Sequence, residues 1–227
     1  MAIKLLSTKD VAINGVKVLV YGLSGAGKTT LIKTLPKPII ISAEAGLLSL
    51  AGMEIPYLSV TTMDELKEAY SFVLEHKDEY QTICLDSISE IGEVVLSAEK
   101  KVAKDPRQAY GALQEQMGDL IRSFRDLPGV NVYFSARAEK TQDELGRILY
   151  APSMPGNKVG QSLPYFFDEV LALRVEQDPD GNTVRMLQCD TDGTWSAKDR
   201  SGKLETWELP DLGAIIEKIT GKGGSNE

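Results

Sequence analysis

The chain has 227 residues, 42% of them apolar, and a formal net charge of −8. This composition indicates a globular protein rather than a disordered chain, and the length predicts one α/β domain over residues 1–220 with a disordered tail at 221–227. An apolar run long enough for a membrane span and the apolar core of a secretory signal are both missing, so we expect a cytoplasmic protein without a membrane partner.

The predicted elements alternate between strands and helices. Short β-branched or apolar runs predict strands over residues 16–21, 39–42, 55–60, 82–85 and 130–135. Helical spacing or composition predicts helices over residues 29–35, 62–74, 88–103, 109–126 and 212–219. This order predicts an α/β fold with a mainly parallel sheet flanked by helices.

The second half of the chain adds two further features. Residues 137–164 are polar, rich in Gly and Pro and weakly periodic, so we expect a long, mobile, functional loop with some local structure there. Residues 167–175 and 183–189 alternate like paired strands around the turn at 178–181, which predicts an antiparallel extension of the sheet towards the carboxyl terminus.

The cysteines and the histidine do not form a metal-binding pattern. Cys84 and Cys189 are far apart in the sequence, no Cys-x-x-Cys pair occurs, and His76 is the only histidine. We expect both thiols to be buried and reduced, and His76 to be a solvated residue at the end of a helix.

Residues 22–29 read Gly-Leu-Ser-Gly-Ala-Gly-Lys-Thr and follow the first strand directly. Glycines let such a loop curl until its N–H groups point at phosphate oxygens, which is the Walker A, or P-loop, arrangement. In that arrangement Lys28 reaches the β- and γ-phosphates, and the hydroxyl of Thr29 is a Mg²⁺ ligand. ATP and Mg²⁺ are therefore the expected ligands. The predicted nucleotide-binding residues are Gly22, Ser24, Gly25, Ala26, Gly27, Lys28, Thr29 and Thr30.

Two carboxylates are candidates for the chemistry. Asp86 ends the run Thr-Ile-Cys-Leu-Asp, the pattern of a Walker B strand that places a carboxylate near Mg²⁺, opposite Thr29. Ser87 follows, where many AAA-type ATPases carry the glutamate that orients the attacking water, so the base must come from elsewhere. Glu44 stands at the carboxyl end of the second strand, where ligands collect in α/β folds. The alternatives are a structural strand-end aspartate and an exposed loop glutamate.

Three short motifs together resemble the RecA/RadA ATPase core. They are Ile-Ser-Ala-Glu-Ala-Gly at 41–46, Leu-Asp-Ser-Ile-Ser at 85–89 and Tyr-Phe-Ser-Ala-Arg at 133–137. The resemblance extends over nearly the whole chain and implies that Glu44 activates water. It also implies that Ser135 and Arg137 sense the γ-phosphate, at a position where RecA proteins usually carry glutamine.

The segment Ala-Lys-Asp-Arg-Ser-Gly at 197–202 is similar to the Lys-x-Arg-x-Gly segment of replicative hexameric helicases. In those rings the two basic side chains reach into the ATP site of the neighbouring subunit. The similarity implies that Lys198 and Arg200 act in trans, where a guanidinium offsets charge that develops on the transferred phosphoryl group. A charged hairpin turn is the alternative.

A core without further domains resembles the phage-encoded RecA-like ATPases grouped with single-strand annealing and recombination proteins. This resemblance implies a DNA-stimulated ATPase in the host cytoplasm that forms a homo-oligomer, ring or filament, on single-stranded DNA, with a single-strand DNA-binding protein as a further partner. The residues that would contact DNA are Lys100, Lys101, Lys104 and Arg107 in one segment, Arg137, Lys140, Arg147 and Lys158 in another, and the stacking residues Tyr110 and Tyr150. Acidic residues interleave with these bases, and the chain is acidic overall, so a solvated charged surface is the alternative.

Two other functions remain open. The loop Gly-Leu-Ser-Gly-Ala-Gly-Lys-Thr-Thr also suits P-loop kinases of small molecules, which need an arginine-rich lid and an acceptor pocket. The other possibility is a non-catalytic partner that binds ATP only to set its oligomeric state.

Overall fold

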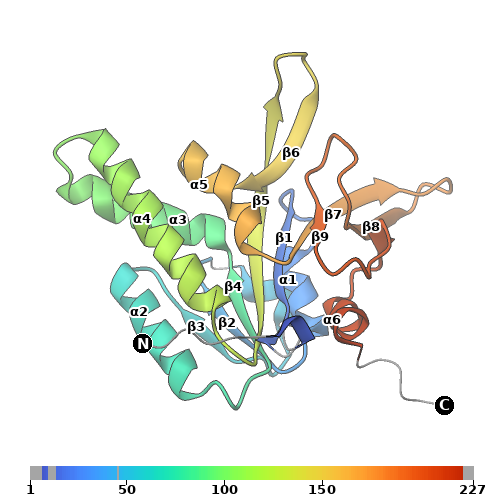
Figure 1. The fold of residues 1–227 in the computed structure, drawn as a ribbon, viewed down its shortest axis with the longest axis horizontal. Coiled ribbons are helices and arrows are strands. Elements are labelled where there is room, and N and C mark those ends of the chain that lie inside the picture. The colour runs from blue at the N-terminus through green and yellow to red at the C-terminus, as the bar shows by residue number, and fades with distance from the viewer. Residues whose placement is uncertain (1–6, 10–13, 45, 222–227) are drawn as a thin grey trace.

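The computed structural model describes residues 7–9, 14–44 and 46–221, so the predicted disordered tail lies outside the described residues apart from Gly221. Ten strands form one sheet in the order β10-β8-β7-β1-β5-β4-β2-β3, with β6 beside β5 and β9 beside β7 (Figure 1). The strands are β1 (Lys17–Gly22), β2 (Pro38–Ser42), β3 (Tyr57–Ser59), β4 (Thr82–Asp86), β5 (Asn131–Gln142), β6 (Ile148–Ser153), β7 (Glu169–Gln177), β8 (Thr183–Gln188), β9 (Lys198–Asp199) and β10 (Trp207–Glu208).

The central strands are parallel and the later additions are antiparallel. Parallel pairing joins β3, β2, β4, β5, β1 and β7. β8, β10, β6 and β9 pair in the antiparallel sense. The predicted fold class, a mainly parallel sheet flanked by helices with an antiparallel extension, is therefore confirmed. One consequence matters for the site: β5 lies between β1 and β4, so the carboxyl ends of all three strands meet at one edge of the sheet.

Local sequence signals set the helix boundaries. The helices are α1 (Lys28–Leu31), α2 (Met63–Glu75), α3 (Ile88–Val102), α4 (Pro106–Arg125), α5 (Asn157–Ser162) and α6 (Leu212–Thr220), with short 3-10 turns η2 (Ile32–Thr34), η3 (Leu47–Leu50) and η4 (Leu163–Phe166). Thr62 and Glu65 form a capping box at the start of α2. Ser87 caps α3 by accepting a hydrogen bond from the backbone N–H of Glu90, and Asp105 caps α4, which begins with a proline.

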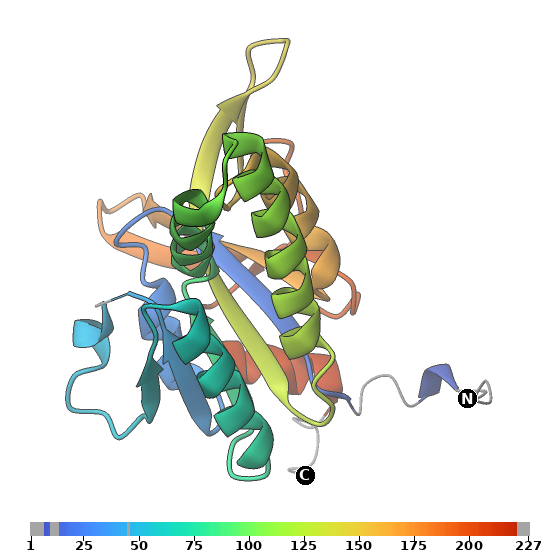
Figure 2. The same cartoon turned by 90° about the vertical axis from the view of Figure 1, so that its left-hand side faces the viewer.

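The sheet has a hydrophobic core on each face, because alternate residues of a strand point to opposite sides. In β1, Leu19 and Tyr21 belong to the core that includes α2, α3 and α4, whereas Val18 and Val20 belong to the core that includes α1 and α6. Figure 2 shows α2, α3 and α4 in front of the sheet, and Figure 1 shows α1 and α6 on its other side. Both faces of the central strands are thus buried, as the continuous apolar runs predict.

Residues 137–164 form far more regular structure than the long loop with some local structure that we expected, so that prediction is wrong in its main part. β5 continues to Gln142 and returns as β6, which pairs with it from Arg137–Ser153 to Gln142–Ile148, and α5 and η4 follow. This β5–β6 hairpin projects beyond the rest of the sheet (Figure 1). Most of its projecting residues are exposed. Both of its faces are therefore open to solvent, and the alternation that marks a half-buried strand is missing.

Three smaller predictions can be compared with the structure. Cys84 and Cys189 are buried and unpaired, as expected. His76 ends α2, but it is half-buried rather than solvated: its ring stacks on Phe72 at 4.1 Å, and its Nδ1 lies 2.8 Å from the Phe72 carbonyl oxygen. Among the helices of the described residues, none combines the length and apolar character needed to cross a membrane.

Candidate nucleotide site

The P-loop connects the buried strand β1 to α1. Gly25 and Gly27 have φ angles of 76° and 107°, in the left-handed region that glycine adopts without steric cost. The turn is closed by a hydrogen bond from the N–H of Ala26 to the carbonyl of Leu23, at 3.2 Å. The glycines of the sequence motif therefore occupy positions where the backbone conformation needs them.

Lys28 lies over this loop. Its Nζ donates hydrogen bonds to the carbonyl oxygens of Gly22 at 2.9 Å and Leu23 at 3.1 Å. Burial lowers the pKa of Lys28, while the nearby carboxylates of Asp86 and Glu44 oppose that shift. The ammonium group is thus held at the mouth of the loop, where phosphate oxygens could replace the two carbonyls as its partners.

Asp86 lies at the carboxyl end of β4 and is 3% exposed. Its Oδ2 accepts a hydrogen bond from Thr29 Oγ1 at 2.7 Å, and its Oδ1 accepts one from Ser135 Oγ. Burial raises the pKa of Asp86, and the hydrogen bonds from Ser135 and Thr29 partly offset this shift. Carboxylate and hydroxyl oxygens are the donors that Mg²⁺ prefers, so Thr29 and Asp86 fit the expected metal. When bound there, the ion would neutralise phosphate charge.

Glu44 follows β2 at the same edge of the sheet. Its Oε1 accepts a hydrogen bond from Ser87 Oγ at 2.5 Å and lies 3.7 Å from Arg137 Nη2. Arg137 also pairs with Glu90, on the first turn of α3. Ser87 and Arg137 therefore hold the Glu44 carboxylate in one orientation, and its role as the base stays a prediction.

One pocket of about 500 Å³ joins these groups. Its lining includes Lys28, Thr29, Glu44, Asp86 and Arg137. Of the predicted nucleotide-binding residues, Gly22, Ser24, Gly25, Gly27, Lys28, Thr29 and Thr30 line it, whereas Ala26 is buried beneath the loop. The two residues predicted to sense the γ-phosphate have different surroundings. Arg137 lines the pocket, whereas Ser135 is fully buried and donates a hydrogen bond to Asp86.

Lys198 and Arg200 lie away from this pocket. Lys198 Nζ donates to the carbonyl oxygens of Pro164 and Phe167, both at 2.7 Å, and is half-buried. Arg200 is exposed and pairs with Asp168 at 3.0 Å. Neither side chain completes the site of its own chain. The action of both residues in trans stays a prediction. For Lys198, the two hydrogen bonds to carbonyl oxygens of its own chain weigh against that role.

The residues predicted to contact DNA are only partly brought together. Arg107 and Tyr110 of the first segment and Lys158 of the second line one hollow of about 630 Å³. Tyr150 instead stacks on Trp195, with ring centroids 4.1 Å apart. The tip of the β5–β6 hairpin, with Lys140 and Arg147, is a separate region.

Sequence reasoning missed several contacts at the nucleotide site. The sequence marks Ser87 only as the residue that stands where many AAA-type ATPases carry a glutamate. In the structure Ser87 caps α3 and donates a hydrogen bond to the Glu44 carboxylate. Glu90 pairs with Arg137, and Arg185 of β8 donates from Nε to the carbonyl of Ala26 in the P-loop at 3.0 Å. The contact between Arg185 and Ala26 joins residues far apart in sequence, and no motif in the chain signals it.

Comparisons with known proteins give a family match and two structural likenesses. An ATPase of the type III secretion system of pathogenic bacteria shares 12% identity over 71% of this chain with a TM-score of 0.50, and the chain spans about half of that structure, 52%. A KaiC-like protein from the archaeon Pyrococcus horikoshii OT3 shares 15% identity over 77% of both chains, with a TM-score of 0.43. At 12% identity the likeness to the secretion ATPase concerns the fold alone, and no curated protein matches the chain. The family described as "AAA domain" matches residues 14–201, most of the sequence, and the protein therefore belongs to this family of P-loop ATPase fold.

Proposed function

We propose that this protein binds ATP with Mg²⁺ and hydrolyses it with Glu44 as the base that activates water. The observation that carries the proposal is the convergence of Lys28, Thr29, Asp86 and Glu44 on one pocket, from the start of α1, the end of β4 and the segment that follows β2. A chance glycine turn would not gather a half-buried ammonium, a buried carboxylate and an oriented carboxylate around itself.

Each group has a distinct role in this proposal. The P-loop backbone and Lys28 bind the phosphates, and Thr29 and Asp86 would hold Mg²⁺. A water molecule attacks the γ-phosphorus, its proton passes to the Glu44 carboxylate, and the bond to the β-phosphate oxygen breaks to give ADP and phosphate. In the same proposal Arg137, whose Nη2 lies 3.7 Å from Glu44 Oε1, stabilises charge on the γ-phosphoryl group.

We also propose that the ATPase acts on single-stranded DNA as a homo-oligomer, in phage recombination or annealing. Two features support this finer proposal. The hollow with Arg107, Tyr110 and Lys158 combines cationic and aromatic side chains, the chemistry that binds a single strand by backbone contact and base stacking. Arg200 is exposed on the surface, where a neighbouring subunit could meet it.

Steady-state ATP hydrolysis, with and without single-stranded DNA, tests the proposal. Wild-type protein should hydrolyse ATP, and Lys28→Ala should be inactive while Lys67→Ala, a matched loss of an exposed lysine on α2, stays active. Hydrolysis stimulated by DNA, with an affinity that falls steeply with salt, would support the DNA-linked function. Stimulation that is lost in Arg200→Ala and restored by mixing with Lys28→Ala protein would support trans action.

Other outcomes separate the alternatives. Hydrolysis indifferent to DNA and to Arg200 would contradict the recombination role. Phosphoryl transfer to a small acceptor in place of hydrolysis would favour a P-loop kinase, and ATP binding without turnover would favour the non-catalytic partner.

A further inference from the structure

A second hollow, of about 390 Å³, adjoins the candidate nucleotide pocket. The two share Gly25, Gly27 and Thr30 in their linings, so they meet along the P-loop and the start of α1. The far walls of the second hollow are formed by Leu173 of β7 and by Pro210, which follows β10. A volume of this size is within the roughly 300–1,000 Å³ range of small-molecule sites.

Arg185 of β8 lines the second hollow and contacts the P-loop. Its Nε donates to the Ala26 carbonyl at 3.0 Å, and a side chain at Gly27 would bring a Cβ to 3.6 Å from the same nitrogen. Within the described part of the chain, most arginines pair with a carboxylate, but Arg185 does not. Its charge is therefore not neutralised by a neighbouring side chain, although it lies beside a loop built for anions.

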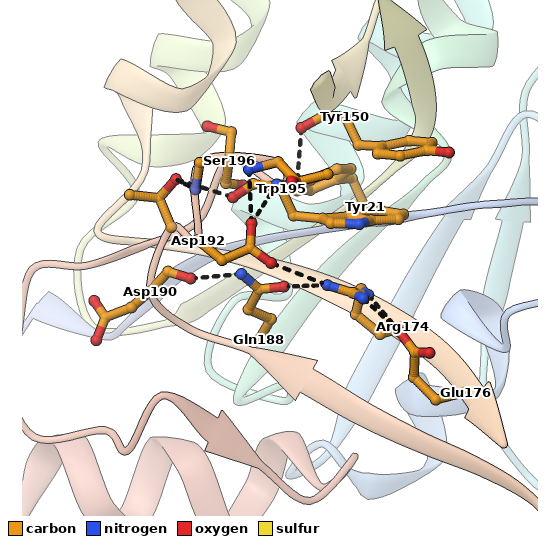
Figure 3. A network of polar contacts seen from close by, with 12 residues as sticks. Tyr21, Tyr150, Arg174, Glu176, Gln188, Asp190, Asp192, Trp195 and Ser196 are labelled. Carbon is orange, nitrogen blue, oxygen red and sulfur yellow. Dashed lines mark hydrogen bonds and ion pairs between the residues drawn. The ribbon is translucent and has the colours of Figure 1, made fainter. Parts of the chain in front are cut away.

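A third hollow beside the P-loop differs in this respect. It is lined by Leu23, Arg174 and Trp195, among others. Figure 3 shows that Arg174 is already bound to Glu176, Gln188 and Asp192, and its guanidinium lies 4.9 Å from the Trp195 ring. The polar groups on that side are matched within the protein, whereas Arg185 keeps its two terminal nitrogens without a hydrogen bond to any described residue.

We propose that the second hollow holds the ribose and base of the bound nucleotide, and that Arg185 is a nucleoside-binding residue whose guanidinium covers the face of the base. This inference rests on the proposed ATP binding. The backbone N–H groups of a P-loop hold the α- and β-phosphates while its lysine reaches the β- and γ-phosphates, so the nucleoside must continue from the loop on the side away from Asp86 and Glu44. The hollow that shares Thr30 offers it space, apolar walls and a planar cation, which stacks favourably on aromatic rings.

Calorimetric titration of the full chain with a non-hydrolysable ATP analogue and with tripolyphosphate tests the inference. Tripolyphosphate fits the P-loop but has no nucleoside. Arg185→Leu should weaken binding of the ATP analogue about tenfold, as expected for a lost cation–π contact, and leave tripolyphosphate affinity unchanged. Arg185→Lys should keep part of the affinity because it keeps the charge, and it decides the question if the leucine variant does not fold. Arg122→Leu, which removes an exposed arginine of α4, should bind both ligands like the wild type.

The results distinguish this inference from the proposed function. Equal loss of both ligands would mean that Arg185 only shapes the P-loop, and unchanged affinity for both would mean that the hollow does not hold the nucleoside; either result overturns the inference while ATP binding stands. Wild-type protein that binds neither ligand would overturn the proposed function as well.

Discussion

Replacing Glu44 by glutamine is expected to separate nucleotide binding from hydrolysis. Glutamine has nearly the same size and keeps an oxygen that can accept the 2.5 Å hydrogen bond from Ser87 Oγ, but it cannot take a proton from water. General-base catalysis typically contributes about 10²–10⁴-fold to a rate, so kcat should fall by that factor. The affinity for ATP should change by less than about threefold, because the hydrogen-bonding groups of Lys28, Thr29 and Asp86 are untouched.

The assay is steady-state phosphate release beside nucleotide binding by calorimetry. Glu139→Gln, an isosteric change at an exposed carboxylate of the β5–β6 hairpin, is the matched control and should leave both measurements unchanged. Ser87→Ala keeps the base but removes its orienting hydrogen bond, so an intermediate loss of about tenfold is expected. If Glu44→Gln hydrolyses ATP within about threefold of the wild-type rate, the base is a different group and the reasoning fails.

Three further changes test the packing and electrostatics of the fold. Ser135→Ala leaves Asp86 Oδ1 without its hydrogen-bond donor in a buried position, so urea titration should show a loss of about 1–3 kcal/mol in the free energy of unfolding. Burial raises the pKa of Glu169 from 4.5 to about 8, so the folded state retains a proton that the unfolded state releases. Stability should therefore fall as the pH rises between these two values, and Glu169→Gln should flatten this part of the stability profile. Gly92→Ala would place a Cβ 2.8 Å from the ring of Pro155, and thermal unfolding should report a loss of about 1–3 kcal/mol from overpacking; an unchanged Tm would show that α3 and this ring can shift apart.

The parts of the fold that the sequence predicts are those with local physical signals. The continuous apolar runs of β1, β2 and β4 correspond to strands buried on both faces, and the Thr62–Glu65 capping box marks the start of α2. The positions of Asp86 and Glu44 were also predictable as strand ends, because parallel strands present their carboxyl ends at one edge of the sheet. The sequence signals of the individual strands are therefore sufficient to predict that the P-loop and the two carboxylates lie at the same edge of the sheet.

The remaining parts depend on contacts between residues distant in the sequence. The β5–β6 hairpin has solvent on both sides, so its strands lack the alternation that depends on a half-buried face. Ser135 could be placed at the end of the sensing strand, but whether it faces a ligand or the Asp86 carboxylate depends on β5 lying directly beside β4. Arg185 approaches Ala26 because β8 follows β7, the neighbour of β1, in the sheet order. Strand order is set by the packing of the whole sheet, and the side chains that depend on it therefore become visible only in three dimensions.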